Sequence, residues 1–370
     1  MKQFFLHHKK LHTWLLADLC LLAAFALLRE SRGAMNAFVG HVSNPIRRFV
    51  GRLCYRVDFS VAEMLCVVLV LTVIAYVIWS VIAVVRAKGR RGRRAYAAFL
   101  GAACGALTLG VVFCWFWGAD YYTDSFQEQS GIYAQPVAAE DLLRVTVYFA
   151  QQTALTADTV ARDESGIFAV PRVDILADSP RAYDALEEQF PFLAFDDLGV
   201  KPIRLSRVMS MLDFTGVYCP YTGEANVNVD SPACMLPATA AHEMAHQRGY
   251  ASEQECNFLA ILASTTCGND TYVYSGWLLG YIYLSNALYR VAPETYWAIR
   301  EALPETVEAD LADNTAYWDQ FRDTAAQKVS NKVYDGMLKA YGQEQGIQSY
   351  GTVVDMLVVY YRDVAARALQ

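Results

Sequence analysis

The sequence has 370 residues, of which 55% are apolar, and its formal net charge is −7. A chain of this length exceeds what one compact core usually organises, so two structural parts are expected. The acidic balance gives no support to nucleic-acid binding, and we expect no nucleic-acid partner.

The first part is predicted to be a membrane domain over residues 1–118. Its three long apolar runs predict transmembrane helices at about 11–28, 61–85 and 95–118, each long enough to cross about 30 Å of hydrocarbon. Asp18 interrupts the first run, and we expect it to face other helices because a carboxylate is costly in lipid. A cleaved signal peptide is the alternative for this run, but no clear small-residue cleavage site follows it.

Charge indicates how this part is oriented. Basic residues are concentrated in residues 1–94, and acidic residues dominate after residue 119. The dense basic loop RAKGRRGRR (86–94) is typical of a cytoplasmic loop, which places the N-terminus in the cytoplasm and residues 119–370 outside it. The arginines between residues 29 and 60 disagree in part, although their charge is more dilute along the chain.

Residues 119–370 predict one mainly helical domain. Apolar residues recur at helical spacing in 139–164 and 349–369, whereas GEANVNVD (223–230) alternates and predicts a short strand. The charge-free stretch 271–289 is either a fourth membrane span or a buried helix. Its tyrosines and polar side chains favour the buried helix.

Four of the nine cysteines follow residue 118, and two of them flank the segment before the histidine motif. In an oxidising compartment Cys219 and Cys234 could be joined, and a disulfide is the expectation to be tested. Free buried thiols are the alternative. The absence of a CxxC pair gives no support to a structural zinc finger.

The motif His242-Glu243-Met244-Ala245-His246 is HExxH. Residues four apart share one face of a helix, so both imidazoles can bind a single Zn²⁺. Glu243 is then placed as the catalytic base that takes a proton from zinc-bound water. A chance match is the alternative, but every other histidine lies in the first 41 residues, and the two in the outer part surround this glutamate.

The third zinc ligand is predicted to be a carboxylate. Catalytic zinc commonly has three protein ligands, and Ser252 stands where the metzincin pattern has a third histidine. Gly249 is expected to end the motif helix, and Ser252 to cap the next one with Glu255 at the third position, as in a capping box. That leaves Glu253 as the preferred ligand and Glu255 as the alternative.

Asn257 lies one helical turn beyond Glu253 on the same face, where it could hydrogen-bond a ligand histidine. The alternative for both glutamates is a purely structural role, because carboxylates stabilise the start of a helix.

The stretch from Gly216 to Ala263 resembles the signature of a bacterial membrane family, the domain-of-unknown-function 3810 family. FWGADYYTDSF and SYGTVVDMLVVYYR are similar to other parts of that family. The resemblance implies a zincin-like fold, with the HExxH helix packed beside a small sheet, and a membrane-anchored zinc-dependent peptidase. Glutamate followed four residues later by asparagine also resembles the gluzincin pattern, which favours Glu253 with Asn257.

Cys256 departs from the EAN sequence usual in the family, but it leaves the pair of Glu253 and Asn257 untouched. The gap between His246 and Glu253 is shorter than in thermolysin-type enzymes, and this second departure leaves the third ligand open. In a zincin-like fold an edge strand before the helix would hold the substrate backbone, and GEANVNV is in that position. Glu224 would then line the cleft or be exposed on the strand.

An oxyanion stabiliser is also needed, and the candidates are Tyr350 and Arg248. A structural ion pair is the alternative for Arg248. The expected fold class is therefore mainly α: three N-terminal transmembrane helices, and an extracytoplasmic zincin-like, gluzincin-type α+β domain with a small sheet over residues 119–370.

The expected function is a multi-pass zinc metallopeptidase of a bacterial cytoplasmic membrane. Its partners would be the lipid bilayer and a peptide or protein substrate at the outer membrane surface. One alternative is a zinc amidase acting on cell-wall peptide. Another is a catalytically silent zincin-like sensor or scaffold, against which the intact Glu243 argues, because metal binding alone does not need that base.

Overall fold

The computed structural model describes residues 8–196, 198–341 and 351–370. The chain divides into two compact units. The first unit consists of Met1–Cys54, Val61–Thr123 and Pro220–Thr222. The second unit consists of Tyr55–Ser60, Asp124–Cys219 and Gly223–Gln370, so the chain passes between the units several times.

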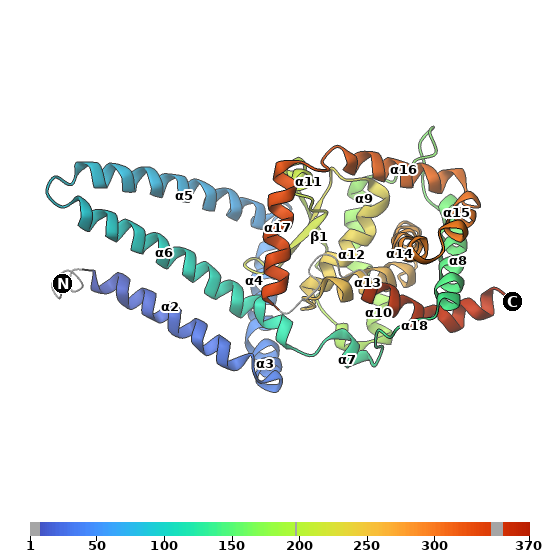
Figure 1. Ribbon diagram of the computed structural model, residues 1–370, viewed down its shortest axis with the longest axis horizontal. Helices are drawn as coiled ribbons and strands as arrows, with labels where there is room; N and C mark the ends of the chain where they lie inside the picture. Colours follow the sequence, from blue (N-terminus) through green and yellow to red (C-terminus); the bar gives the residue numbers. More distant parts are fainter. Residues whose placement is uncertain (1–7, 197, 342–350) are drawn as a thin grey trace. The chain divides into compact units, whose positions relative to one another are not determined.

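The first unit contains three long apolar helices, α2 (Lys9–Leu28), α5 (Val61–Arg86) and α6 (Arg91–Phe116) (Figure 1). Each is long and apolar enough to cross a membrane, as the sequence predicted. The most apolar stretch of α5 buries none of its residues inside the protein, a distribution that suits contact with lipid.

Four shorter elements complete the first unit: α3 (Arg32–Phe38), the π-helical turn Val39–Ser43, α4 (Asn44–Cys54) and the 3₁₀ helix Gly118–Tyr122.

Packing between α2 and α6 satisfies the carboxylate within the first apolar run. Asp18 is buried and accepts a hydrogen bond from the Thr108 hydroxyl of α6 at 2.8 Å. The prediction that Asp18 faces another helix is therefore confirmed. Arg47 of α4 forms a buried ion pair with Asp120, so each of these two buried charges has an opposite charge beside it.

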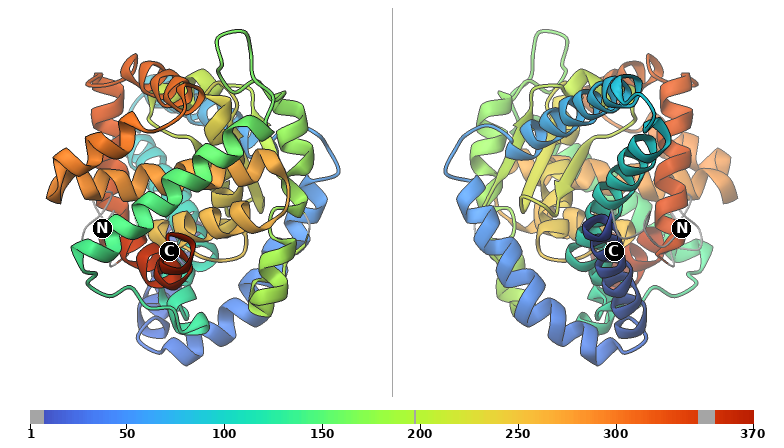
Figure 2. Two further views of the ribbon diagram at one scale, coloured as in Figure 1. Left: turned by 90° about the vertical axis from the view of Figure 1, so that its right-hand side faces the viewer. Right: turned by 90° about the vertical axis from the view of Figure 1, so that its left-hand side faces the viewer.

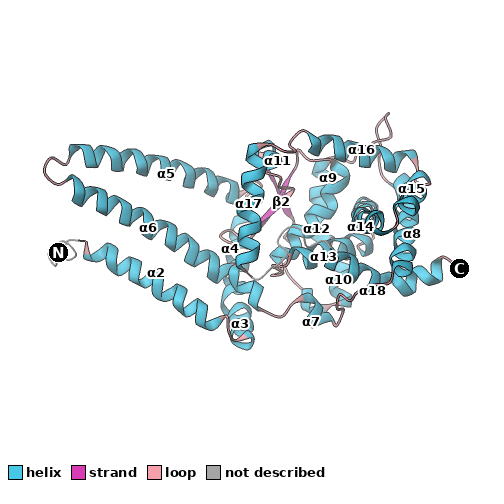
Figure 3. Cartoon of the chain, viewed as in Figure 1, coloured by secondary structure: helices cyan, strands magenta, loops and turns pink. Residues whose placement is uncertain are grey.

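The second unit is mainly helical with a small mixed sheet (Figure 3). Its strands are β1 (Val200–Ile203), β2 (Gly216–Cys219) and β3 (Glu224–Asn228), in the order β1-β3-β2. The central strand β3 pairs parallel with β1 and antiparallel with β2. The expectation that GEANVNV forms the edge strand is wrong, because a tight hairpin adds β2 outside β3.

The helices of the second unit, in chain order, are α7 (Phe126–Ser130), α8 (Ala139–Thr156), α9 (Arg172–Asp178), α10 (Asp184–Gln189), α11 (Ser206–Met211), α12 (Leu236–Gln247), α13 (Glu253–Thr266), α14 (Asp270–Val291), α15 (Pro293–Glu301), α16 (Glu305–Asp319), α17 (Ala325–Ala340) and α18 (Gly351–Ala368), with 3₁₀ turns at Ala157–Thr159, Ser179–Arg181, Pro191–Leu193 and Ala233–Met235.

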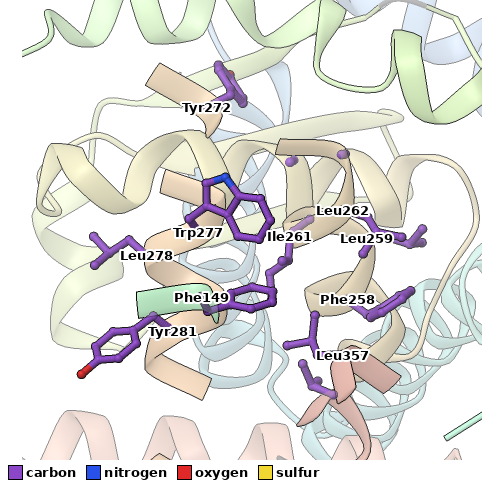
Figure 4. Close-up of a cluster of buried hydrophobic side chains, with 14 of the residues drawn as sticks. Phe149, Phe258, Leu259, Ile261, Leu262, Tyr272, Trp277, Leu278, Tyr281 and Leu357 are labelled. Atoms are coloured by element: carbon purple, nitrogen blue, oxygen red, sulfur yellow. The ribbon is translucent and has the colours of Figure 1, made fainter. Parts of the chain in front are cut away.

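The core of this unit is built around α13 and α14, which pack on each other and on α8, α12 and α18 (Figure 2). Aromatic and aliphatic side chains from these helices interlock (Figure 4). The Phe149 ring lies against the backbone of α14 at Gly280, where any side chain would collide with it. Phe149 also meets Trp277 edge-on, with ring centroids 4.8 Å apart.

The charge-free stretch 271–289 falls within α14 and is a buried helix, as expected. Tyr272, Tyr274 and Tyr281 are almost fully enclosed. The hydroxyl of Tyr272 donates to the Ile175 carbonyl at 2.9 Å, which supplies the partner that a buried phenol requires. In the described part of the chain, only α2, α5 and α6 are candidates for crossing a membrane.

The expected disulfide is not formed, because neither Cys219 nor Cys234 is part of a disulfide bond. Cys219 pairs with Glu224 at the start of β3, whereas Cys234 follows the other end of that strand. At about 3.3 Å per residue, the two ends of the five-residue strand β3 are farther apart than the roughly 7 Å that a disulfide can span between Cα atoms. Cys234 is instead a buried thiol just before α12.

Candidate metal centre

Helix α12 presents both histidines of the motif to one side. His242 and His246 are one turn apart, and their ring centroids are separated by 4.8 Å. The helix ends at Gln247, and Gly249 follows with a φ of 99°, in the left-handed region that glycine adopts easily. The predicted helix end at Gly249 is confirmed, and the turn that follows leads directly into α13.

Hydrogen bonds fix the orientation of both rings. His242 Nδ1 lies 2.9 Å from Asn257 Oδ1, and His246 Nδ1 lies 2.7 Å from the carbonyl oxygen of Tyr250. Both partners are acceptors, so each neutral ring carries its proton on Nδ1 and leaves a lone pair on Nε2. The two Nε2 atoms are 3.1 Å apart. Two lone pairs at this distance repel each other unless a cation lies between them.

Glu253, the first residue of α13, brings its carboxylate to the same point. Its Oε2 is 3.2 Å from His242 Nε2, and its Oε1 is 3.5 Å from His246 Nε2. One ligand atom from each of the three residues can be chosen so that all three atoms lie within 4.8 Å of one another. The group could therefore hold a metal ion between α12 and α13, two helices that pack against each other (Figure 1).

The electrostatics of the three residues are coupled. Burial opposes the charged form of His246, but its contacts with Cys256 and Glu253 outweigh burial and raise its pKa. Burial raises the pKa of Cys256 to about 11, so this thiol stays neutral. The negative charge next to His246 is therefore the carboxylate of Glu253. Burial also opposes ionisation of Glu253, but the two histidines hold its pKa well below the usual range. A metal ion must therefore displace a proton from His246.

Glu255 points elsewhere. Its carboxylate accepts the backbone N–H groups of Phe126 and Gln127, each at 3.1 Å, at the start of α7. Ser252 is the N-cap of α13, but its side chain makes no capping hydrogen bond. The predicted capping box within α13 is therefore wrong, because Glu255 caps a different helix.

Glu243 lies on the same helix as the two histidines and is only 4% exposed. Within the described residues its Oε2 has no hydrogen-bond partner. Burial raises the pKa of Glu243 to about 7, although the charges of His242 and His246 work in the opposite direction. A carboxyl group with a pKa near neutrality can both accept and return a proton at physiological pH.

Residues 39–358 match the family model described as "Protein of unknown function (DUF3810)". The chain belongs to the DUF3810 family. The match covers α5, α6 and the whole group around His242. Neither the curated proteins nor the solved structures yielded a significant match.

Two residues of this DUF3810 protein complete the surroundings of the histidines, and sequence reasoning did not select either for that role. The Tyr334 hydroxyl of α17 donates to Glu253 Oε1. The Cys256 thiol lies 3.1 Å from the Tyr250 carbonyl oxygen and 3.2 Å from His246 Nδ1. No motif could have identified Tyr334, because it lies 81 residues beyond Glu253 in the sequence.

The remaining sequence candidates in the DUF3810 protein lie apart from this group. Arg248 is buried, forms an ion pair with Glu187 at 2.7 Å and stacks over the Tyr183 ring at 3.9 Å. This is the structural ion pair named as its alternative, and it leaves the guanidinium unsuited to an oxyanion. Tyr350 falls outside the described residues.

Glu224 neither lines a cleft nor is exposed. It is fully buried and pairs with Lys201 at 2.7 Å. Side chains alternate along a strand, and the neighbouring Ala225 and Val227 belong to the core beside α12, so Glu224 faces the opposite side of the sheet. There the Lys201 ammonium also donates to the Phe59 carbonyl oxygen at 3.0 Å.

Glycine is required at position 216 of β2, because the strand contacts the Glu243 side chain there. A Cβ at this position would lie 2.5–2.7 Å from Oε1, Cγ and Cδ of Glu243. We expect Gly216→Ala to displace Glu243 and to lower the free energy of unfolding by about 1–3 kcal/mol, as overpacking generally does. Thermal denaturation measures this loss.

Gly336 of α17 supplies the matched control. Nothing lies within 4 Å of a Cβ built at that position. Gly336→Ala should therefore leave stability unchanged or raise it by about 0.5–1 kcal/mol, because alanine is the better helix former. Equal stability of the Gly216→Ala and Gly336→Ala proteins would contradict the close contact between β2 and Glu243.

Proposed function

We propose that this DUF3810 protein is a membrane-anchored zinc metallopeptidase, in which His242, His246 and Glu253 are the zinc ligands and Glu243 is the general base. One observation carries the proposal. Two imidazole lone pairs and a carboxylate converge on one point, beside a buried carboxyl group on the same helix whose pKa is raised to about 7.

The spacing of the donor atoms supports zinc. Zn²⁺ binds nitrogen and oxygen donors at about 2.0–2.1 Å in tetrahedral geometry, which puts neighbouring ligand atoms roughly 3.3 Å apart. The two Nε2 atoms are 3.1 Å apart, and His242 Nε2 lies 3.2 Å from Glu253 Oε2, while one ligand atom from each residue lies within 4.8 Å of the others. Two imidazoles with one carboxylate also suit zinc better than calcium or magnesium, which prefer oxygen ligands alone.

The chemistry follows from this arrangement. Zinc, when bound, polarises a carbonyl and lowers the pKa of a water molecule to near neutrality. Glu243 takes the proton from the attacking water and returns it to the leaving amine, and a pKa near 7 suits both steps. Asn257 and the Tyr250 carbonyl hold the two rings in place, and Tyr334 does the same for Glu253.

The sheet supports a peptide as the substrate. β2 is one of the two edge strands of the described sheet, and its Gly216 touches Glu243. An extended peptide that pairs with the outer edge of β2 would therefore run beside the proposed base. This assigns to β2 the role that the sequence suggested for GEANVNV.

The decisive experiment uses the full-length chain purified in detergent without chelator. We expect about one zinc per chain by elemental analysis. We also expect cleavage of a peptide library that stops on chelation and returns with added zinc. Protein that binds no zinc even after its addition would overturn the proposal. Bound zinc without any peptide cleavage would favour the amidase or the silent sensor.

The two neighbouring glutamates of α13 provide a matched pair of variants. Glu253→Gln should weaken zinc binding by about tenfold or more, because it replaces a charged ligand by a neutral amide. Glu255→Gln should leave zinc affinity unchanged and lower thermal stability instead, because it weakens the cap on α7. Competition with a fluorescent zinc chelator measures the affinities, and the reverse order would make Glu255 the ligand.

The orientation of the chain is part of the proposal. We expect a reporter fused after Gly118 to be extracytoplasmic and one fused at Gly92 to be cytoplasmic, because the basic residues 86–94 lie where α5 ends and α6 begins. The opposite pattern would place the metal centre in the cytoplasm.

A further inference from the structure

Helix α17 contacts the proposed metal centre through one side chain (Figure 1). The Tyr334 hydroxyl donates to Oε1 of Glu253, the first residue of α13. The Tyr334 ring also meets the Phe214 ring edge-on, with centroids 5.6 Å apart. Phe214 lies two residues before β2, the strand that touches Glu243 at Gly216. Tyr334 therefore links the segment that supplies the carboxylate ligand to the strand beside the proposed base.

The rest of α17 is held by few contacts. Gln327 and Asn331 both donate to the exposed carboxylate of Asp213 at 3.0 Å. Of the residues of α17, all of which the structure describes, only Leu338 is buried. Gly336 in the helix interior lowers helix stability further, because glycine loses more backbone freedom on folding than other residues. A segment with so little buried apolar surface opens locally at low cost, unlike α13, most of whose residues are buried.

The metal centre is poorly accessible while α17 is attached. The His242 side chain is 14% exposed and the His246 side chain 6%. The proposed peptide would pair with the outer edge of β2 and run toward these rings. On its way it would meet the connection that Tyr334 makes between the start of β2 and Glu253.

We propose that α17 is a gate over the metal centre and that Tyr334 is its latch. In the closed state described here, α17 is attached to Glu253 and Asp213. In the open state both attachments are released, and an extended peptide enters along β2. The identity of the substrate rests on the proposed metallopeptidase function, whereas opening of the gate requires neither bound zinc nor catalysis.

The test measures access to the two histidines in the metal-free, full-length chain. The protein is purified in detergent with a chelator and treated with diethyl pyrocarbonate, a small reagent that acylates accessible imidazole nitrogens. Mass spectrometry then quantifies the modification of His242 and His246. His41, an exposed histidine of the first unit, is the internal reference. In the unaltered protein we expect His242 and His246 to react far more slowly than His41.

Releasing the gate should expose both rings. Gln327→Ala with Asn331→Ala removes both hydrogen bonds to Asp213. We expect this pair to raise the modification of His242 and His246 by about tenfold, because each lost hydrogen bond shifts the opening equilibrium several-fold. The modification of His41 and the melting temperature should stay unchanged, which excludes general unfolding as the cause.

Two further proteins complete the comparison. Tyr334→Phe removes the latch hydrogen bond but keeps the ring against Phe214, and it should raise the modification of both histidines as well. It tests the gate independently if the alanine pair folds poorly. Lys332→Ala with Val333→Ala changes two exposed residues of the same helix and is the matched control, which should react like the unaltered protein.

Peptide cleavage relates the gate to the proposed function. In zinc-loaded protein, Gln327→Ala with Asn331→Ala should raise kcat/KM for an extended peptide several-fold and leave the zinc content unchanged, because entry no longer waits for a rare opening. A raised histidine modification with an unchanged kcat/KM would show that α17 opens without controlling peptide entry, and would overturn its role as a gate.

Two results of the modification experiment would also overturn the proposal. The first is equal modification of His242 and His246 in the unaltered protein, in the alanine pair and in Tyr334→Phe, which would make α17 a fixed wall. The second is an equal rise in the Lys332→Ala, Val333→Ala control. Both are read without metal or substrate, so failure of the gate is distinguishable from failure of the metallopeptidase proposal, which the zinc content and peptide cleavage decide.

Discussion

Replacing Glu243 with glutamine should abolish peptide hydrolysis while leaving zinc bound. Glutamine has nearly the same shape, so the contact with Gly216 and the positions of both histidines are preserved. It cannot accept a proton, and loss of a general base typically costs about 10²–10⁴-fold in rate. Peptide cleavage measures the rate, and elemental analysis of the same preparation measures the zinc.

The thermal stability of this variant provides an internal check. Burial disfavours the ionised form of Glu243, so replacing it with a neutral amide should not lower the melting temperature. Glu301→Gln, at an exposed position of α15, is the matched control and should retain full activity. Normal cleavage by the Glu243→Gln protein would exclude Glu243 as the base, whatever the metal content.

Replacing His246 with alanine is expected to have the largest effect on metal content. Structural zinc sites bind with about 10–16 kcal/mol, so losing one of three protein ligands should weaken binding by about a thousandfold or more. Zinc should then no longer raise the melting temperature, because ligand stabilisation requires binding to the folded state. Calorimetric titration and thermal denaturation with and without zinc measure the two effects.

His246 is buried, so a folding defect must be separated from loss of a ligand. His242→Ala removes the other, more accessible imidazole and should cause the same loss of zinc. His41→Ala changes an exposed histidine of the first unit and should leave zinc binding intact. Unchanged zinc affinity in both folded variants, His242→Ala and His246→Ala, would exclude this metal centre.

Sequence reasoning succeeded where local spacing decides the structure. The four-residue interval between His242 and His246 places the rings on one face of any helix, and Gly249 marks the helix end through its own backbone preference. The tyrosine-rich α14 is buried for an equally local reason, because its composition suits a protein core better than lipid.

The same reasoning failed wherever distant segments meet. The local pattern of Ser252 and Glu255 predicts a capping box. The Glu255 carboxylate instead accepts hydrogen bonds from backbone N–H groups at the start of α7, more than 120 residues earlier in the sequence. The prediction of an edge strand failed for a similar reason. The alternation in GEANVNV indicates that the segment is a strand, but it does not indicate which strands pair with it. Tyr334 and Gly216 reach the centre only through tertiary packing, which leaves no local signature.

The first turns of α13 also constrain how the chain can change in length. Glu253 faces the histidine rings, Glu255 caps α7, Cys256 touches His246 and Asn257 holds His242. Each helical residue is rotated by about 100° from the one before it, so a single insertion or deletion within these turns would turn the residues that follow it away from their partners. A change of one residue in length would therefore disturb more of these contacts at once than any single substitution.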